Sequence, residues 1–109
     1  MRDQTPLVPG ALDFDVTVYL VLNDFGRLGR AYVETDETQA DEATIVESIL
    51  GGQYSQPLRV VAFNTTEGWA RDVTEDIARA ALSRAQSERR SIARAAQEFL
   101  ERTLGADVP

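Results

Sequence analysis

Three segments of the chain alternate apolar and polar residues in the manner of β-strands. Residues 14–22 carry apolar side chains on both faces of an extended strand, which predicts a central strand of a sheet. Residues 23–29 supply turn residues with two glycines, and residues 30–34 alternate again with charged side chains, so the pair predicts a hairpin whose second strand lies at a sheet edge. Residues 58–63 are again mostly apolar on both faces and predict a third strand.

Two further stretches repeat apolar residues at helical spacing behind a capping-box signal. Asp36 with Gln39 opens a predicted helix over residues 37–50, and Asp72 with Glu75 opens a helical stretch that could run to residue 103. A helix of that second length would measure roughly 45 Å, whereas a compact domain of this size is only about 35 Å across. The polar run at residues 86–91 therefore leaves two outcomes: a break after which the last helix folds back, or a continuous helix whose overhanging apolar face binds a second copy.

The order strand, strand, helix, strand, helix predicts an α+β fold of two layers. A right-handed crossover would place the third strand beside the first, which gives a small three-stranded, mostly antiparallel sheet in the order 2-1-3 with two helices on one face and a long C-terminal helix. We expect a flexible N-terminal lead-in at residues 1–12, a single domain at 13–104 and a disordered tail at 105–109.

Composition narrows the chemistry, because the chain of 109 residues contains no histidine, cysteine or lysine. A thiolate nucleophile, a zinc site of the Cys/His type and a lysine Schiff base are thereby excluded. This disfavours an enzyme but leaves one that uses carboxylates open, and we expect no cofactor. The net charge of −7 argues against general nucleic-acid binding. No apolar run is long enough to span a bilayer, and the alanine- and arginine-rich composition is typical of a GC-rich bacterial genome, so we predict a bacterial cytoplasmic protein.

The first candidate binding surface is the predicted loop after the third strand, which precedes a helix start. Hydroxyl, amide, indole and guanidinium groups lie close together in this loop, and its candidate contact residues are Asn64, Thr65, Thr66, Trp69 and Arg71. Such a loop could bind a small polar ligand or a peptide. The alternative is structural: the indole covers the edge of the core, the guanidinium pairs with a nearby carboxylate, and Asp72 caps the helix.

The second candidate is the hairpin tip, where Phe25, Arg27 and Leu28 lie among two glycines. A glycine-rich turn bearing arginines can hold phosphate, but turn geometry alone also explains the glycines. A third candidate is the set of acids at Asp13, Asp15 and residues 34–42, which could bind a hard cation in a carboxylate-dependent enzyme. Acids near a helix N-terminus are favoured by the helix dipole without any metal.

The last candidate is a basic stripe on the C-terminal helical stretch. Residues 77–97 hold five arginines and one glutamate, whereas residues 1–76 hold five arginines and fourteen acids. On a continuous helix Arg79, Arg90 and Arg94 would share one face and could bind an acidic partner. The alternative is a solvated face with ion pairs between successive helical turns.

These patterns favour a small protein-interaction or regulatory module that uses either the Trp69 and Arg71 loop or the C-terminal helix, which could also form a homodimer. The alternative is a small anionic-ligand-binding domain that uses the loop after the third strand, followed by a carboxylate-dependent metal enzyme. The sequence leaves open whether Trp69 is functional or structural.

Overall fold

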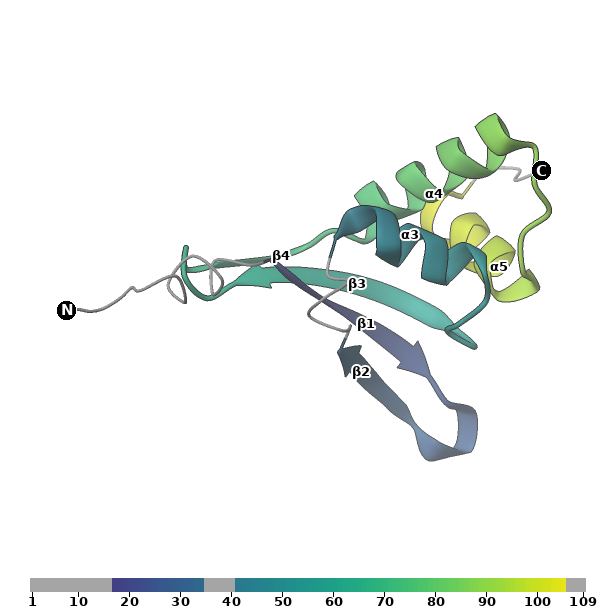
Figure 1. Ribbon diagram of the computed structural model, residues 1–109. Helices are drawn as coiled ribbons and strands as arrows, with labels where there is room; N and C mark the ends of the chain where they lie inside the picture. The colour runs from purple at the N-terminus through teal and green to yellow at the C-terminus, as the bar shows by residue number, and fades with distance from the viewer. Residues whose placement is uncertain (1–16, 35–40, 106–109) are drawn as a thin grey trace.

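The computed structural model describes residues 17–34 and 41–105, and the expected lead-in at residues 1–12 lies outside these ranges. In the described parts the chain forms four strands, three α-helices and one short 3₁₀ helix (Figure 1). They run in the order β1 (Val18–Asp24), η1 (Gly26–Leu28), β2 (Arg30–Glu34), α3 (Glu42–Leu50), β3 (Pro57–Asn64), β4 (Trp69–Asp72), α4 (Thr74–Glu88) and α5 (Arg94–Leu104).

The strands form one antiparallel sheet in the order β2-β1-β3-β4. The predicted α+β class and the strand order 2-1-3 are confirmed. The predicted count of three strands is too low, because β4 adds a fourth strand beside β3 from residues that we expected to form a loop and a helix cap. Helix α4 consequently begins at Thr74 rather than directly after Asp72, although the Asp72 carboxylate still accepts a hydrogen bond of 2.9 Å from the Thr74 amide.

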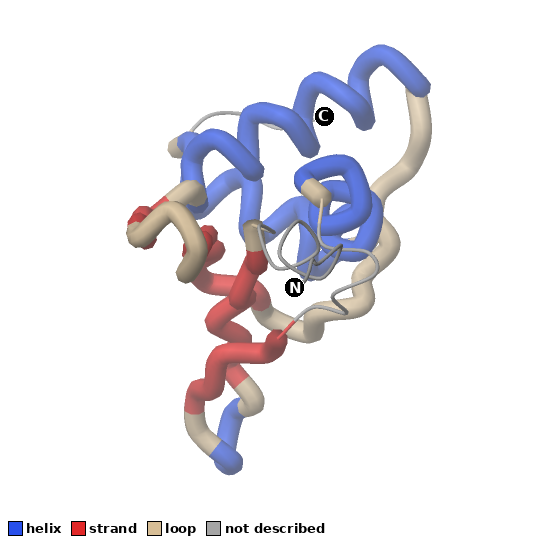
Figure 2. The backbone as a smooth tube through the Cα atoms, turned by 60° about the vertical axis from the view of Figure 1, so that its left-hand side comes forward, coloured by secondary structure: helices blue, strands red, loops and turns tan. Residues whose placement is uncertain are grey.

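All three α-helices lie on one side of the sheet, as Figures 1 and 2 show. The core lies between the two layers, where Val21, Val60 and Ala62 of the sheet meet side chains from every α-helix. Phe99 is the largest of the fully buried side chains. The two-layer arrangement is therefore set by the helix-facing side chains of β1 and β3 and by one apolar stripe on each helix.

Helix α3 begins at Glu42, because Asp41 is its N-cap and accepts a hydrogen bond of 2.7 Å from the Thr44 amide. The helix is therefore shorter than the predicted range of residues 37–50. The capping signal expected at Asp36 lies outside the described residues.

The long helical stretch is interrupted between α4 and α5, so the structure has the first of the two expected outcomes, a break with the last helix folded back (Figure 1). Arg89 adopts the left-handed conformation that often ends a helix, with φ of 50° and ψ of 39°. The Ala93 amide then donates a hydrogen bond of 3.2 Å to the Leu50 carbonyl at the end of α3. This bond fixes the α4–α5 linker, residues 89–93, against the end of the first helix. At the other end of α5, Gly105 caps the helix, and the rest of the tail expected at residues 105–109 lies outside the described residues.

Candidate functional site

The side chains of the loop after β3 mainly contact one another. Asn64 is buried, and its side-chain oxygen accepts a hydrogen bond of 2.8 Å from the Glu67 amide. The Trp69 indole donates a hydrogen bond of 2.9 Å to Glu67, and the Arg71 guanidinium lies 4.9 Å from the centre of the indole ring. Trp69 is partly buried and packs against the core, while Thr65 and Thr66 are exposed in the turn. These contacts support the structural interpretation of Trp69.

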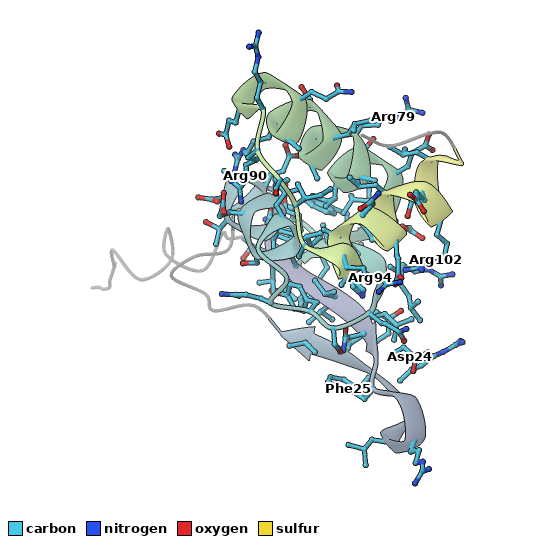
Figure 3. All side chains as sticks on the ribbon, turned by 90° about the vertical axis from the view of Figure 1, so that its right-hand side faces the viewer. Asp24, Phe25, Arg79, Arg90, Arg94 and Arg102 are labelled. Carbon is cyan, nitrogen blue, oxygen red and sulfur yellow. The ribbon has the colours of Figure 1, made fainter. Side chains whose placement is uncertain are left out.

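The hairpin tip is exposed and compact. The side chains of Phe25 and Leu28 are 43% and 89% exposed, and Arg27 lies between them in η1. Both flanking glycines, Gly26 and Gly29, have positive φ, so the turn explains their presence. The tip is the end of the β1–β2 hairpin, and it extends away from the helices, as Figure 3 shows at Phe25.

The predicted basic stripe is divided between separate elements. Arg79 lies on α4, Arg90 in the α4–α5 linker and Arg94 on α5, and Figure 3 shows them well apart. Each arginine is paired: Arg79 with Glu75, Arg94 with Glu98 at 3.5 Å, and Arg90 with Glu47 at 2.8 Å and with Glu88 at 3.2 Å. The break in the helix therefore separates side chains that a continuous helix would have aligned.

The acids proposed for a metal ion are not assembled in the described part of the chain. Asp13, Asp15 and residues 35–40 lie outside it, and the described residues hold no group of three or more carboxylates that could bind a metal ion. Helix α3 instead uses its first acids as ordinary caps, and the hydrogen bonds from Thr44 lower the pKa of Asp41.

The sheet surface turned away from the helices carries a row of apolar side chains with charged residues, Arg59 and Asp72 among them, at one end, and the sequence patterns did not single it out as a binding surface. Along β1, Val21 and Asn23 are buried on the helix side, so the alternate residues point outward. We call this outward surface the open face. It consists of Val18, Leu20 and Leu22 on β1, Tyr32 on β2, and Val61 and Phe63 on β3. None of the described elements lies over it, as Figure 1 shows from the side.

Tyr32 is 48% exposed, whereas the aliphatic residues of the open face are partly buried. The register places Leu22 beside Tyr32 of β2, and it places Leu20 beside Val61 and Val18 beside Phe63 of β3, so the apolar surface runs across β2, β1 and β3. Asn23, on the opposite side of β1, makes two hydrogen bonds: its side-chain amide donates to the Ser55 hydroxyl at 3.1 Å, and its side-chain oxygen accepts from the Gln56 amide at 2.8 Å. On the covered side of β1 the buried Asn23 thus lies next to the apolar Val21, while Val18, Leu20 and Leu22 lie on the open side.

One end of the open face continues into a depression of about 440 Å³, which we call the basic hollow. Its lining consists of Leu22, Arg30, Leu58, Arg59, Asp72, Thr74, Arg102 and Thr103. Arg59 lies 3.5 Å from Asp72, and Arg102 is held by a hydrogen bond of 2.7 Å to the Pro57 carbonyl. Arg30 in turn lies 3.8 Å from Asp24, so three arginines with two carboxylates leave one excess positive charge at the hollow of a chain that is acidic overall.

Comparison with known proteins gives no match to a family model, to a curated protein or to a solved structure. Among the described residues, no helix is both long and apolar enough to cross a membrane. The open face, the basic hollow and the rest of the described surface are therefore the evidence on function.

Proposed function

We propose that this chain is a protein-interaction module that binds an amphipathic segment of another protein. The apolar side of that segment packs on the open face, and its acidic residues lie against the basic hollow. One observation carries the proposal: β1 and β3 present apolar side chains on both faces of the sheet, while the described helices cover only one face.

A solvated face of an antiparallel sheet is normally polar, so an apolar outer face is informative. Contiguous apolar patches on a soluble domain mark interaction sites, and full burial of one aliphatic side chain contributes about 1.5–3 kcal/mol. Because Leu20, Leu22 and Val61 are already partly buried, each has less than about 1 kcal/mol left to contribute to binding. Tyr32, at 48% exposure, is the residue type most often found at interface hot spots.

Charge favours an acidic partner over a second copy of the chain. The basic hollow brings Arg30, Arg59 and Arg102 together with Asp72, and Arg30 also lies 3.8 Å from the Asp24 carboxylate at the end of β1. Face-to-face packing of two copies on this surface would bring six guanidinium groups and four carboxylates together, which still leaves an excess of buried positive charge. A segment that brings its own carboxylates would neutralise the excess.

The other predicted surfaces have less support. The apolar side of α5 is used inside the protomer, where Phe99 and Leu100 are fully buried, so the last helix does not overhang. An anionic ligand at the loop after β3 would have to compete for Arg71, which already stacks on Trp69. The absence of histidine, cysteine and lysine further supports binding rather than catalysis.

The test begins with selection of peptides from a random phage-displayed library on the full chain. Selected peptides are then measured by fluorescence anisotropy against the wild type and three variants. Phe63→Thr removes an aromatic side chain from the open face, and Arg59→Gln removes one charge from the basic hollow. Arg94→Gln is the matched control, because Arg94 is exposed, ion-paired and located in the helical layer.

We expect peptides that combine apolar and acidic residues, with affinity reduced roughly ten-fold by Phe63→Thr and several-fold by Arg59→Gln, and unchanged by Arg94→Gln. The proposal is wrong if no such peptides are enriched, or if they bind the Phe63→Thr and wild-type chains equally. It is also wrong if sedimentation equilibrium shows a dimer that Phe63→Thr dissociates, because the open face would then bind a second copy.

A further inference from the structure

A second candidate site lies in the helical layer, on the other side of the sheet from the open face. The end of α4, the α4–α5 linker and the start of α5 enclose a pocket of about 580 Å³. The pocket is lined by Leu82, Ala85, Gln86, Arg89, Arg90, Ser91, Ile92 and Gln97. Its size lies within the range of small-molecule sites, which are often found between packed helices.

The lining combines an apolar floor with a polar rim. Leu82, Ala85 and Ile92 belong to the core or pack against it, so the floor is fixed by the fold. The polar lining residues are Gln86, Arg89, Arg90, Ser91 and Gln97, and none of the lining residues is acidic. Two of them are engaged elsewhere, because Arg90 pairs with Glu47 and Glu88 and the Gln97 amide donates to Glu101 at 3.4 Å. A ligand with an apolar body and one negative group would complement both parts.

Arg89 is the residue that gives this pocket its charge. Among the described residues it is the one non-glycine residue with positive φ, in a conformation that costs a side chain about 1–2 kcal/mol. Its guanidinium has no ion-pair partner within the described ranges, whereas its neighbour Arg90 is held by Glu47 and Glu88. Arg89 therefore combines an unfavourable backbone with an exposed cation at the pocket.

A smaller depression of about 310 Å³ adjoins the pocket, because Leu82 and Gln86 line both of them. It continues along α4 to Leu104 at the end of α5. The two depressions are therefore neighbours, and each contains apolar lining residues, Leu82 in both and Leu104 in the smaller one. An extended ligand could thus place its charged end at Arg89 and its apolar tail along Leu82 toward Leu104.

We propose that this pocket binds a small carboxylate with an apolar chain. The chain packs on Leu82 and Ile92, the carboxylate pairs with Arg89, and the amide of Gln86 donates to the same carboxylate. This inference is independent of the protein-interaction proposal, since it uses different residues on the opposite layer.

The experiment uses the full chain and decanoate below its micellar concentration. Binding is measured by calorimetry and located by amide chemical shifts in heteronuclear NMR spectra. 1-Decanol and decylamine serve as probes with the same chain and a neutral or positive end. Arg89→Gly is the informative variant, because glycine suits the left-handed backbone and the protein should fold at least as stably as the wild type. Arg94→Gln is the control, because Arg94 is 91% exposed and does not line this pocket.

We expect decanoate to shift the amides of residues 82–97 and to bind at least about ten-fold more tightly than 1-decanol, as a charge-assisted contact implies. Arg89→Gly should weaken decanoate by the same factor, bring it to the level of 1-decanol, and raise the melting temperature. Arg94→Gln should change neither value. Equal affinity for the three probes, shifts confined to the open face, absence of binding, or wild-type affinity in Arg89→Gly would each overturn the proposal.

Discussion

Replacing Gly52 by alanine should destabilise the protein through two separable effects. Gly52 has φ of +78°, which alanine tolerates poorly, and an added Cβ would lie 2.8 Å from the Cβ atom of Ala93. This contact fixes the α4–α5 linker on the end of α3, next to the hydrogen bond from the Ala93 amide to Leu50. The substitution therefore tests whether the linker is packed as closely as the structure shows.

The chain provides its own reference for the backbone effect. Gly68 has nearly the same φ, +77°, but an added Cβ there would meet nothing within 4 Å. Gly68→Ala should therefore cost only the conformational penalty, about 1–2 kcal/mol. Gly52→Ala adds overpacking against Ala93, typically about 1–3 kcal/mol, for a total of about 2–5 kcal/mol.

The assay is urea unfolding followed by far-ultraviolet circular dichroism, with free energies from linear extrapolation. The double variant Gly52→Ala, Ala93→Gly removes the overlapping methyl group, so its cost beyond that of Ala93→Gly alone should fall to the Gly68→Ala value. If Gly52→Ala costs no more than Gly68→Ala, or if Ala93→Gly brings no relief, the close packing of the linker is refuted.

Three further predictions concern the two faces of the sheet, Trp69 in the loop after β3, and the stability of the protein at acid pH. Val61→Thr on the open face should lower the free energy of unfolding by less than about 1 kcal/mol, whereas Val60→Thr, at 0% exposure on the helix side, should lower it by about 1–3 kcal/mol; equal losses in urea titrations would show that the open face is covered. Trp69→Ala should lower the melting temperature, because the indole packs against the core, and an unchanged melting curve would contradict a structural role for Trp69. Hydrogen bonds from Arg90 lower the pKa of Glu47, so the stabilisation they give is fully present above the ordinary pKa of 4.5 and is lost as the pH falls below it. Glu47→Gln should therefore reduce the change in the urea midpoint between about pH 7 and pH 3. An unchanged pH dependence of the midpoint would refute the linkage.

The sequence predicted the parts of the fold that have a local period. Residues alternating around Leu20 and around Val61 located β1 and β3, and the spacing of apolar residues located the helices. Strand β4 was not predicted, because it has only four residues, two of them charged. Its extended conformation depends on pairing with β3 rather than on an alternating pattern of its own. The strand order followed from the right-handed crossover that joins β2 to β3.

The candidate site was harder to predict for a related reason. The apolar residues on both faces of β1 indicated a central strand, but they did not show which face the helices would leave open. The basic hollow gathers Arg30 from β2, Arg59 from β3 and Arg102 from α5, so no window of sequence contains it. The basic stripe shows the reverse case. Its arginines are close in sequence, but the break in the helix separates them in space.

That break creates both proposed sites. With a continuous helix, residues after 89 would extend away from the domain, and Arg102 could not donate its hydrogen bond of 2.7 Å to the Pro57 carbonyl beside the basic hollow. The pocket would also be lost, because its walls are the facing sides of α4 and α5, joined by residues 89–93. Arg89 makes the turn in a conformation that glycine would adopt at lower cost. A glycine there would preserve the fold-back and the basic hollow while removing the Arg89 guanidinium, which has no ion-pair partner among the described residues, so Arg89→Gly separates the charge of the pocket from its shape.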